Sequence, residues 1–272
     1  MTYDDFRAGE KQGWDARADA YGTATARATV QSIPDLLAAV RLAPGMRILD
    51  VCCGPGYAAG AAAALGAEAR GIDFAPQMVR QAQARFPGLA FDEGDAERLA
   101  FPDASFDAVL CNFGLFHVTA PELAMSEAFR VLRPGGHFAF SQWCAPDENP
   151  VHRLTLDIVR RLADMNVAPS APDAFILSSR HTAKGMMAQA GFTDIALRDV
   201  PILLRAPAED FFDFMMRFGV RIPLILERQT EAVRAAIRKA CDVEAQAFRS
   251  GDEIHLPMPG IVVSGQKEGL LP

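Results

Sequence analysis

The sequence predicts an α/β fold in which helices cover both faces of a mostly parallel sheet. Strand-like and helical stretches alternate between residues 46 and 145, which is the pattern of parallel strands joined by crossover helices. The first strand ends near Asp50 and runs into a loop that contains Gly54 and Gly56. A glycine loop between a first strand and a helix is typical of nucleotide-binding sheets.

Each strand of this region is an apolar run bounded by turn residues or by a helix. Five strands are expected, at residues 46–51, 69–72, 89–92, 106–111 and 136–143. Helices are predicted between them at residues 57–65, 76–86 and 121–132. Pro76 lies in the first turn of the second helix, where proline is tolerated.

Residues 1–45 are predicted to be helical and to lie in front of the sheet. Two helices are expected first, at residues 14–21 and 24–30. A third begins with Ser32 as its N-cap and has Pro34 in its first turn. It ends at Pro44-Gly45.

Beyond Trp143 the alternation gives way to longer helical stretches. One helical face carries Val151, Leu154, Ile158 and Leu162, and residues 167–174 interrupt it. Helices are also predicted at residues 181–190, 209–218 and 230–248.

Two strand regions are expected in this last part of the chain. The first, at residues 192–204, should be broken or bent at Pro201. The second, at residues 254–266, carries Pro257 and Pro259, so its first half should lie at an edge or outside the sheet.

Composition excludes several classes of protein. The 272 residues are 50% hydrophobic and 22% charged, enough to bury a full core as one domain with additions. A net charge of −7 disfavours binding to nucleic acid. The five cysteines form no zinc or disulfide pattern and suit reduced thiols. With no secretion signal or membrane-spanning run, we expect a cytoplasmic protein, either a monomer or a homodimer.

The glycine loop alone allows several nucleotide cofactors. Its tight turn would bring backbone N–H groups close to a ligand, and Asp73, at the end of the second strand, could bind a ribose diol. Residues 54–59 also satisfy the pattern G-x-G-x-x-A, so an NAD(P)-dependent oxidoreductase is an alternative. The Tyr-x-x-x-Lys pair of short-chain dehydrogenases is absent, because the tyrosines are followed four residues later by Arg7, Thr25 and Ala61.

A series of motifs follows the glycine loop in order. Gly94-Asp95-Ala96 comes after the third strand, Asn112-Phe113-Gly114-Leu115-Phe116-His117 comes after the fourth, and Glu127 to Gly136 leads into the fifth. In these motifs the chain resembles the class I S-adenosylmethionine-dependent methyltransferases, in particular the ubiquinone/menaquinone-biosynthesis-like small-molecule group with a methyltransferase domain of type 11. The resemblance covers residues 10–145 strongly and the remainder in outline.

The resemblance implies a Rossmann-like, doubly wound, seven-stranded sheet whose last strand is antiparallel, with N-terminal helices and a helical lid. Residues 1–45 would be the helical cap and residues 46–145 the cofactor-binding core. Residues 146–272 would supply the lid insertions and the final strands of the same sheet.

The resemblance also implies a cofactor and the residues that contact it. The cofactor would be S-adenosylmethionine, released as S-adenosylhomocysteine, with no metal. The implied contact residues are Tyr21, Asp50, Cys52, Gly54, Gly56, Asp73, Phe74, Met78, Asp95, Ala96, Asn112 and Phe113.

These residues would divide the cofactor among them. Asp50 and the loop at residues 52–56 would lie under the methionine part, and Asp73 would take the ribose hydroxyls. The adenine would lie between Phe74 and Met78 and bind Asp95 and the backbone of Ala96. Asn112 and Phe113 would line the gap toward the acceptor, and Tyr21 would close over the cofactor.

Cys52 departs from the family pattern, which has glycine at the first position of this loop. Cysteine has a Cβ atom, so the backbone there must keep a negative φ or tolerate a costly positive one. A catalytic thiol at Cys52 or Cys53 is an alternative to plain packing.

His117 is the candidate general base, because it follows the fourth strand on the same rim. A histidine hydrogen-bonded to the surrounding structure is the other interpretation. His152 and His181 are weaker candidates, and His137, inside the fifth strand, is expected to be structural.

The expected reaction is an in-line transfer of the sulfonium methyl to an oxygen, carbon or nitrogen of a small molecule. The helix at residues 209–218 is apolar on almost every side, so it either packs in the core or forms a lid over an apolar pocket. The lid would indicate a mostly apolar acceptor. A non-catalytic S-adenosylmethionine-binding partner subunit is the remaining alternative.

Overall fold

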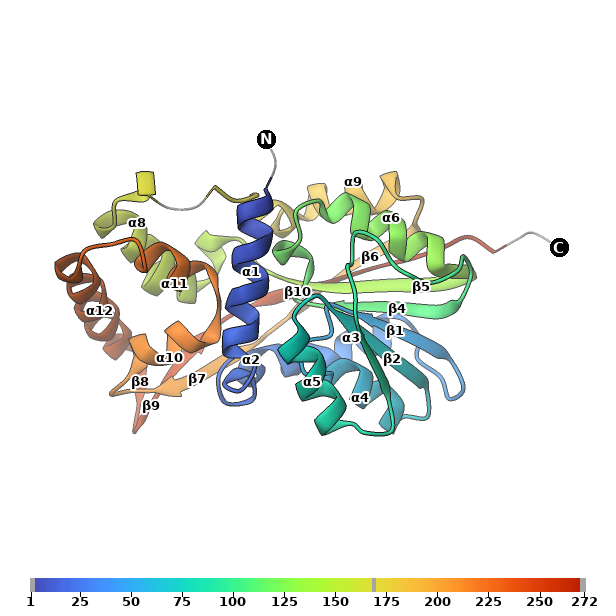
Figure 1. The fold of residues 1–272 in the computed structure, drawn as a ribbon, viewed down its shortest axis with the longest axis horizontal. Helices are drawn as coiled ribbons and strands as arrows, with labels where there is room; N and C mark the ends of the chain where they lie inside the picture. The colour runs from blue at the N-terminus through green and yellow to red at the C-terminus, as the bar shows by residue number, and fades with distance from the viewer. Residues whose placement is uncertain (1–2, 168–169, 270–272) are drawn as a thin grey trace.

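A seven-stranded sheet forms the centre of the molecule, with the strands in the order β3-β2-β1-β4-β5-β10-β6 (Figure 1). The computed structural model describes residues 3–167 and 170–269. The strands are β1 Arg47–Val51, β2 Glu68–Asp73, β3 Ala90–Glu93, β4 Phe106–Asn112, β5 Leu132–Trp143, β6 Thr193–Val200 and β10 Gly260–Gln266. The first five are parallel, and β10 is antiparallel to both β5 and β6. The predicted fold class is confirmed.

Two hydrophobic layers cover this sheet, one on each face. Helices α3 Ile33–Ala39, α4 Tyr57–Ala64 and α5 Pro76–Arg85 pack on one face, and α6 Pro121–Val131 and α9 Arg180–Gln189 pack on the other. Successive side chains of a strand point to opposite faces. In β4, Ala108 and Leu110 therefore join the first layer, whereas Val109 and Cys111 join the second.

The chain before the sheet begins with a longer helix than predicted. Helix α1 spans Asp4–Arg17, whereas the prediction placed a helix at residues 14–21. The polar stretch before Trp14 is helical because Phe6, Glu10 and Gly13 form a buried face with it. Short turns follow α1: η1 Tyr21–Thr23, α2 Ala26–Thr29 and η2 Val30–Ser32.

A smaller lobe lies beside the main sheet, and α1 runs between the two (Figure 1). Its three-stranded antiparallel sheet has the order β7-β9-β8, with β7 Leu203–Pro207, β9 Glu253–Pro257 and β8 Arg249–Ser250. Helix α10 Phe211–Phe218 packs on β7, α12 Glu231–Ala245 packs on α10, and α11 Arg221–Leu226 packs against α1. The turn η8 Gln246–Phe248 leads into β8. Helix α11 contains Pro223 and was not predicted.

Prolines divide the two late strand regions between the two sheets. The region at residues 192–204 breaks next to Pro201 into β6 and β7. The region at residues 254–266 breaks between Pro257 and Gly260, so β9 lies outside the main sheet as expected.

The segment after β5 is helical but irregular. It contains η4 Pro146–Glu148, α7 Pro150–His152, the π-helical turn η5 Arg153–Asp157, α8 Ile158–Leu162, η6 Met165–Val167 and η7 Ile176–Ser178. The interruption predicted at residues 167–174 lies partly outside the described residues. Among residues 3–167 and 170–269, no helix is both long and apolar enough to cross a membrane.

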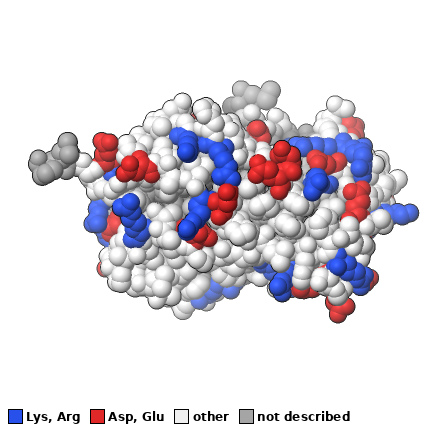
Figure 2. All heavy atoms as spheres, turned by 180° about the vertical axis from the view of Figure 1, so that it is seen from behind, with Lys and Arg blue, Asp and Glu red and all other residues white. Residues whose placement is uncertain are grey.

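The turn η3 Leu115–His117 follows β4 and completes the rim of the main sheet. On the face shown in Figure 2, positive and negative side chains are interspersed.

Candidate active site

A cavity of about 390 Å³ lies at the carboxyl ends of the central strands, beneath α1 and beside the smaller lobe. This edge is where open α/β sheets bind their ligands. The predicted site residues that line the cavity are Tyr21, Cys52, Gly54, Asp73, Phe74, Met78, Asp95, Ala96, Asn112, Phe113 and His117. Asp50 and Gly56 lie behind this lining.

The glycine loop turns sharply between β1 and α4. Gly54 and Gly56 both have positive φ, 51° and 79°, a conformation that glycine adopts without cost. Gly56 is the N-cap of α4, and a Cβ atom on it would lie 2.7 Å from the Phe91 ring. The sequence folds this way because only a residue without a side chain fits between the loop and Phe91.

Asp73 joins the end of β2 to this loop. Its carboxylate accepts hydrogen bonds from the backbone N–H groups of Gly54, at 2.8 Å, and Ala75, at 2.9 Å. Burial raises the pKa of Asp73 to about 6, against the opposing effects of these two hydrogen bonds and of His117. Each carboxylate oxygen retains a second lone pair for a ligand hydroxyl.

Asp50 is more deeply buried, with 1% of its surface exposed. One oxygen accepts the Ala59 N–H at 3.0 Å, and the other has no hydrogen-bond partner among the described residues. Burial raises the pKa of Asp50 to about 7, and the Ala59 hydrogen bond opposes this. A buried carboxylate oxygen without a partner matches a ligand that carries a donor such as an amine.

The predicted adenine side is apolar and is closed by α1. Met78 and the half-buried Phe74 pack with Trp14 of α1. Asp95 accepts the Glu97 N–H at 2.9 Å and also forms an ion pair with Arg7 of α1. The Asp95 carboxylate therefore already has two partners, and an adenine amine would have to share it with Arg7.

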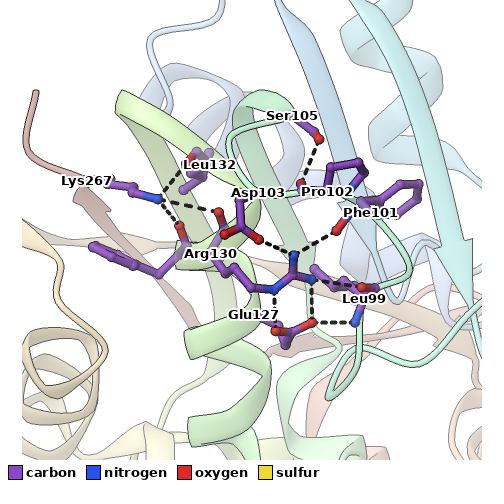
Figure 3. A network of polar contacts seen from close by, with 10 residues as sticks. Leu99, Phe101, Pro102, Asp103, Ser105, Glu127, Arg130, Leu132 and Lys267 are labelled. Carbon is purple, nitrogen blue, oxygen red and sulfur yellow. Dashed lines mark hydrogen bonds and ion pairs between the residues drawn. The ribbon is translucent and has the colours of Figure 1, made fainter.

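The loop that carries Asp95 is tied to α6 by a polar network (Figure 3). Arg130 donates to the Glu127 carboxylate, to Asp103 and to the backbone carbonyls of Leu99 and Phe101. Glu127 also accepts the Leu99 N–H at 2.7 Å. Arg130 and Glu127 of the fifth-strand motif thus fix the loop rather than face the cavity.

Asn112 ties the N-terminal turns to the sheet. Its amide donates to the Thr29 carbonyl at 3.0 Å, and its carbonyl oxygen accepts from Ser32 and Ser141, each at 2.7 Å. Phe113 follows with a φ of 55° and stacks on Trp143 with the ring centroids 3.7 Å apart. Asn112 therefore lines the cavity with its hydrogen-bonding groups engaged.

Tyr21 lies across the glycine loop. Its ring atoms are 3.7–3.8 Å from the position that a Cβ atom of Gly54 would take, and its hydroxyl is 3.4 Å from the Thr29 hydroxyl. Burial raises the pKa of Tyr21, so its hydroxyl stays neutral.

His117 contacts an acid that sequence reasoning missed. Its Nδ1 lies 2.7 Å from the Glu10 carboxylate of α1, and its ring meets the Trp14 ring edge to face at 5.0 Å. Glu10 lies on the buried face of α1 with Phe6 and Trp14. An acid on an otherwise apolar helical face was the signal that could have found it.

Comparisons with known proteins decide the family. Residues 49–140 match the model of a methyltransferase domain. The demethylmenaquinone methyltransferase of Renibacterium salmoninarum is 31% identical over 172 residues, which are 60% of this chain and 73% of that relative. This chain belongs to the class I S-adenosylmethionine-dependent methyltransferases of the quinone-biosynthesis type. It is therefore an enzyme that transfers a methyl group from S-adenosylmethionine to a small molecule.

Two further similarities agree with this family. The demethylmenaquinone methyltransferase of Beutenbergia cavernae is 40% identical over 111 residues, covering 41% of this chain and 46% of the relative. The crystal structure of a putative methyltransferase from Bacillus halodurans has a TM-score of 0.56 and 22% identity, covering 87% of this chain and 98% of the other. The second likeness concerns the fold alone.

Cys52 of this methyltransferase adopts the positive φ, the more costly of the two backbone conformations expected for it. Its φ is 55°, and its side chain packs close to Gly114 and Cys111. The contact with the Cys111 thiol and burial both raise the pKa of Cys52, which disfavours the thiolate that a nucleophile needs. In the described part of the chain, all five cysteines are free, and no cluster of three metal-ligating side chains occurs.

Beyond Trp143 the residues that line the cavity are mostly apolar, but His152, Arg160, Asp173 and Arg221 are among them. Helix α10 packs in the core through Phe211 and Phe214, and its Met215 and Phe218 line the cavity. His152 also lines it, and burial lowers the pKa of this imidazole to about 4. His137 and His181 are not among the lining residues.

Proposed function

We propose that this methyltransferase acts on a mostly apolar aromatic acceptor that carries a hydroxyl group, a hydroquinone or a related phenol. The observation that carries the proposal is one cavity with two chemically different halves. The buried Asp73 and the glycine loop lie in one half, and Trp143, Met215 and Phe218 lie in the other. The names of the demethylmenaquinone methyltransferases, which act on a quinone, support the same acceptor class.

The residues present fit S-adenosylmethionine in the first half. Asp73 would bind the ribose hydroxyls through its spare lone pairs, and the partnerless oxygen of Asp50 offers an acceptor toward the methionine amine. Gly54 lines the cavity, and Gly56 lets the loop turn sharply next to Phe91. Phe74 and Met78 would flank the adenine.

The remaining predicted residues complete the proposed cofactor site. Asp95 and Ala96 would bind the adenine edge, Tyr21 would cover the ligand, and Asn112 with Phe113 would separate cofactor from acceptor. Cys52 would contribute only its backbone. The N-terminal cap at residues 1–45 and the part after residue 145 would close over the core at residues 46–145.

When bound, S-adenosylmethionine supplies a methyl group on a positively charged sulfur. An acceptor atom attacks the methyl carbon in line with the C–S bond, and the sulfur is the leaving group. The protein's task is to hold the two partners in register and exclude water. His117 would accept the proton of the acceptor hydroxyl, so that the oxygen, or a ring carbon conjugated with it, becomes nucleophilic.

Methyl transfer from radiolabelled S-adenosylmethionine to reduced 1,4-naphthoquinones tests the proposal. We expect a labelled product that extracts into organic solvent, and an equal amount of S-adenosylhomocysteine. Calorimetry that detects no binding of S-adenosylhomocysteine at millimolar concentration would overturn the cofactor assignment. Turnover with polar amines alone would overturn the acceptor class.

A further inference from the structure

Glu10 is a buried carboxylate with an unusual position on the N-terminal helix. Its side chain is 2% exposed, and its Oε2 lies 2.7 Å from His117 Nδ1. No other hydrogen bond of the Glu10 side chain is found among the described residues. Burying a charged group is costly unless it is paired, so a role in packing alone does not explain an acid here.

Two guanidinium groups provide further charge compensation. Burial lowers the pKa of Arg17 and of Arg221, and the negative charge of Glu10 opposes this lowering in both. The electrostatic surroundings of the buried Glu10 therefore include Arg17 and Arg221.

The contact of a Glu10 carboxylate with Nδ1 fixes the tautomer of His117. A carboxylate can only accept hydrogen bonds, so Nδ1 of the imidazole must donate. In the neutral ring, Nε2 is then the acceptor. The Trp14 ring, nearly perpendicular to the imidazole at 89°, holds the ring orientation, and His117 lines the cavity.

His117 is also close to the predicted cofactor side. His117 and Asp73 line the same cavity. The imidazole thus contacts the acid of α1 and borders the cavity that also holds the carboxylate expected to bind the ribose. A base in this position can reach an acceptor atom next to the cofactor.

We propose that Glu10 is the positioning residue of a Glu10–His117 pair that prepares His117 Nε2 to take the proton of the acceptor hydroxyl. The inference rests on the proposed function. The acceptor O–H bond breaks, its proton moves to Nε2, and its electron pair drives formation of the new bond to the methyl carbon. The C–S bond breaks with its electrons on sulfur, and the imidazolium later releases its proton to water.

The pair also connects the base to the contacts that hold α1 in place. The same helix carries Arg7, which pairs with Asp95 and with Glu97 at 2.9 Å. Asp15 of α1 accepts the Gln77 N–H at 2.8 Å. The helix that orients the base is therefore fixed to the loop that carries Asp95 and to α5 by these contacts.

The first test reads the tautomer directly and needs no substrate. Nitrogen-15 NMR of the histidine rings, with the His117 signals assigned from His117→Gln, should show the Nδ1–H tautomer in the ligand-free wild type. Glu10→Ala should shift His117 toward the Nε2–H form, whereas Asp5→Asn, which removes an exposed charge from the same helix, should not. A wild-type ring in the Nε2–H form would overturn the proposal.

The second test is kinetic, with reduced 1,4-naphthoquinone and phenols of graded acidity as acceptors. Glu10→Gln should lower kcat by about 10-fold or more, which is part of the roughly 10²–10⁴-fold contribution that a general base makes. The Kd for S-adenosylhomocysteine should be little changed. The loss should shrink for more acidic phenols, which need less help to ionise, and a merely structural defect would not follow acceptor acidity.

The two tests together distinguish failure of the proposed function from failure of the Glu10–His117 proposal. If the wild type methylates none of these acceptors, the acceptor class of the proposed function is wrong, and the tautomer spectrum still decides the pair. If the wild type turns over and Glu10→Gln matches Asp5→Asn in kcat for every acceptor, the Glu10–His117 proposal is overturned.

Discussion

The Gly54 N–H donates a hydrogen bond to the Asp73 carboxylate at 2.8 Å. This contact joins the loop after β1 to the end of β2, two parts of the proposed cofactor site that are 19 residues apart in the sequence. Asp73 therefore both holds the loop and offers lone pairs to a ligand.

Replacing Asp73 with Asn should weaken cofactor binding and also destabilise the glycine loop. Hydrogen bonds to a charged group contribute about 1.5–3 kcal/mol each, so we expect the Kd for S-adenosylhomocysteine to rise about 10- to 100-fold or more by calorimetry. Asn offers one acceptor where two backbone N–H groups donate, so the unfolding free energy should also fall. Asp92→Asn, which removes an exposed acid paired with Arg70, is the control; an equal effect in both variants would contradict the assignment.

Gly56 should not tolerate a side chain. An alanine there would combine a φ of 79° with a Cβ atom 2.7 Å from the Phe91 ring. We expect Gly56→Ala to lower the unfolding free energy by about 2 kcal/mol or more in urea titrations. Gly185→Ala, in α9 with no atom within 4 Å of the new Cβ, should be neutral or stabilising by up to about 1 kcal/mol. A stable Gly56→Ala protein would show that the loop can move away from Phe91.

Replacing Cys52 separates its packing from a chemical role. In Cys52→Gly, relief of the positive φ, about 1–2 kcal/mol, opposes lost packing and greater freedom of the unfolded chain. The unfolding free energy, the affinity for S-adenosylhomocysteine (SAH) and kcat should therefore stay close to the wild-type values. Cys52→Val should be destabilising, because a β-branched residue at positive φ is a true outlier. Loss of turnover in Cys52→Gly with retained SAH binding would instead indicate a catalytic thiol.

The two buried acids predict how stability depends on pH. Burial raises the folded-state pKa of Asp50 to about 7 and of Asp73 to about 6, whereas both are about 3.9 when unfolded. The folded state therefore keeps protons that the unfolded chain releases between about pH 4 and pH 7. The unfolding free energy of the ligand-free enzyme should fall as pH rises through this window.

Urea titrations across this range measure the effect. Each group contributes a fall of about 1.4 kcal/mol per pH unit while its proton is bound only in the folded state. Asp50→Asn should remove the contribution of Asp50 to the pH dependence of the unfolding free energy. Subtracting the variant's free energy from that of the wild type removes the contributions of the other titrating groups. A wild-type stability that rises relative to Asp50→Asn over this range would be inconsistent with the raised pKa of Asp50.

The core of the fold could be predicted because its signals are local. Strands β1 to β5 are apolar runs with turn residues between them, and the motif order identified the family. The ends of α1 were misplaced, because the residues before Trp14 are polar and their helix depends on packing against α5 and α11. Helix α11 was missed since it is short and contains Pro223. The second sheet depends on β7 pairing with β9, a contact between distant segments that the prolines alone do not specify.

The site residues also divide into those that the sequence predicts and those that it does not. Residues such as Asp73 and Asp95 are found at strand ends, a position that topology gives directly. Glu10 could not be paired with His117 from the sequence, because the contact joins residues 107 positions apart. The acceptor half draws Met215 and Phe218 from the smaller lobe, where the resemblance is only in outline.

The most direct test of the proposed cofactor site is a crystal structure of the enzyme with S-adenosylhomocysteine. We predict that the ribose hydroxyls lie within hydrogen-bond distance of the Asp73 carboxylate, with the adenine beside Phe74 and Met78 and the amino-acid end at the glycine loop. A ligand bound away from the ends of β1 and β2, or a ribose that does not contact Asp73, would contradict the account.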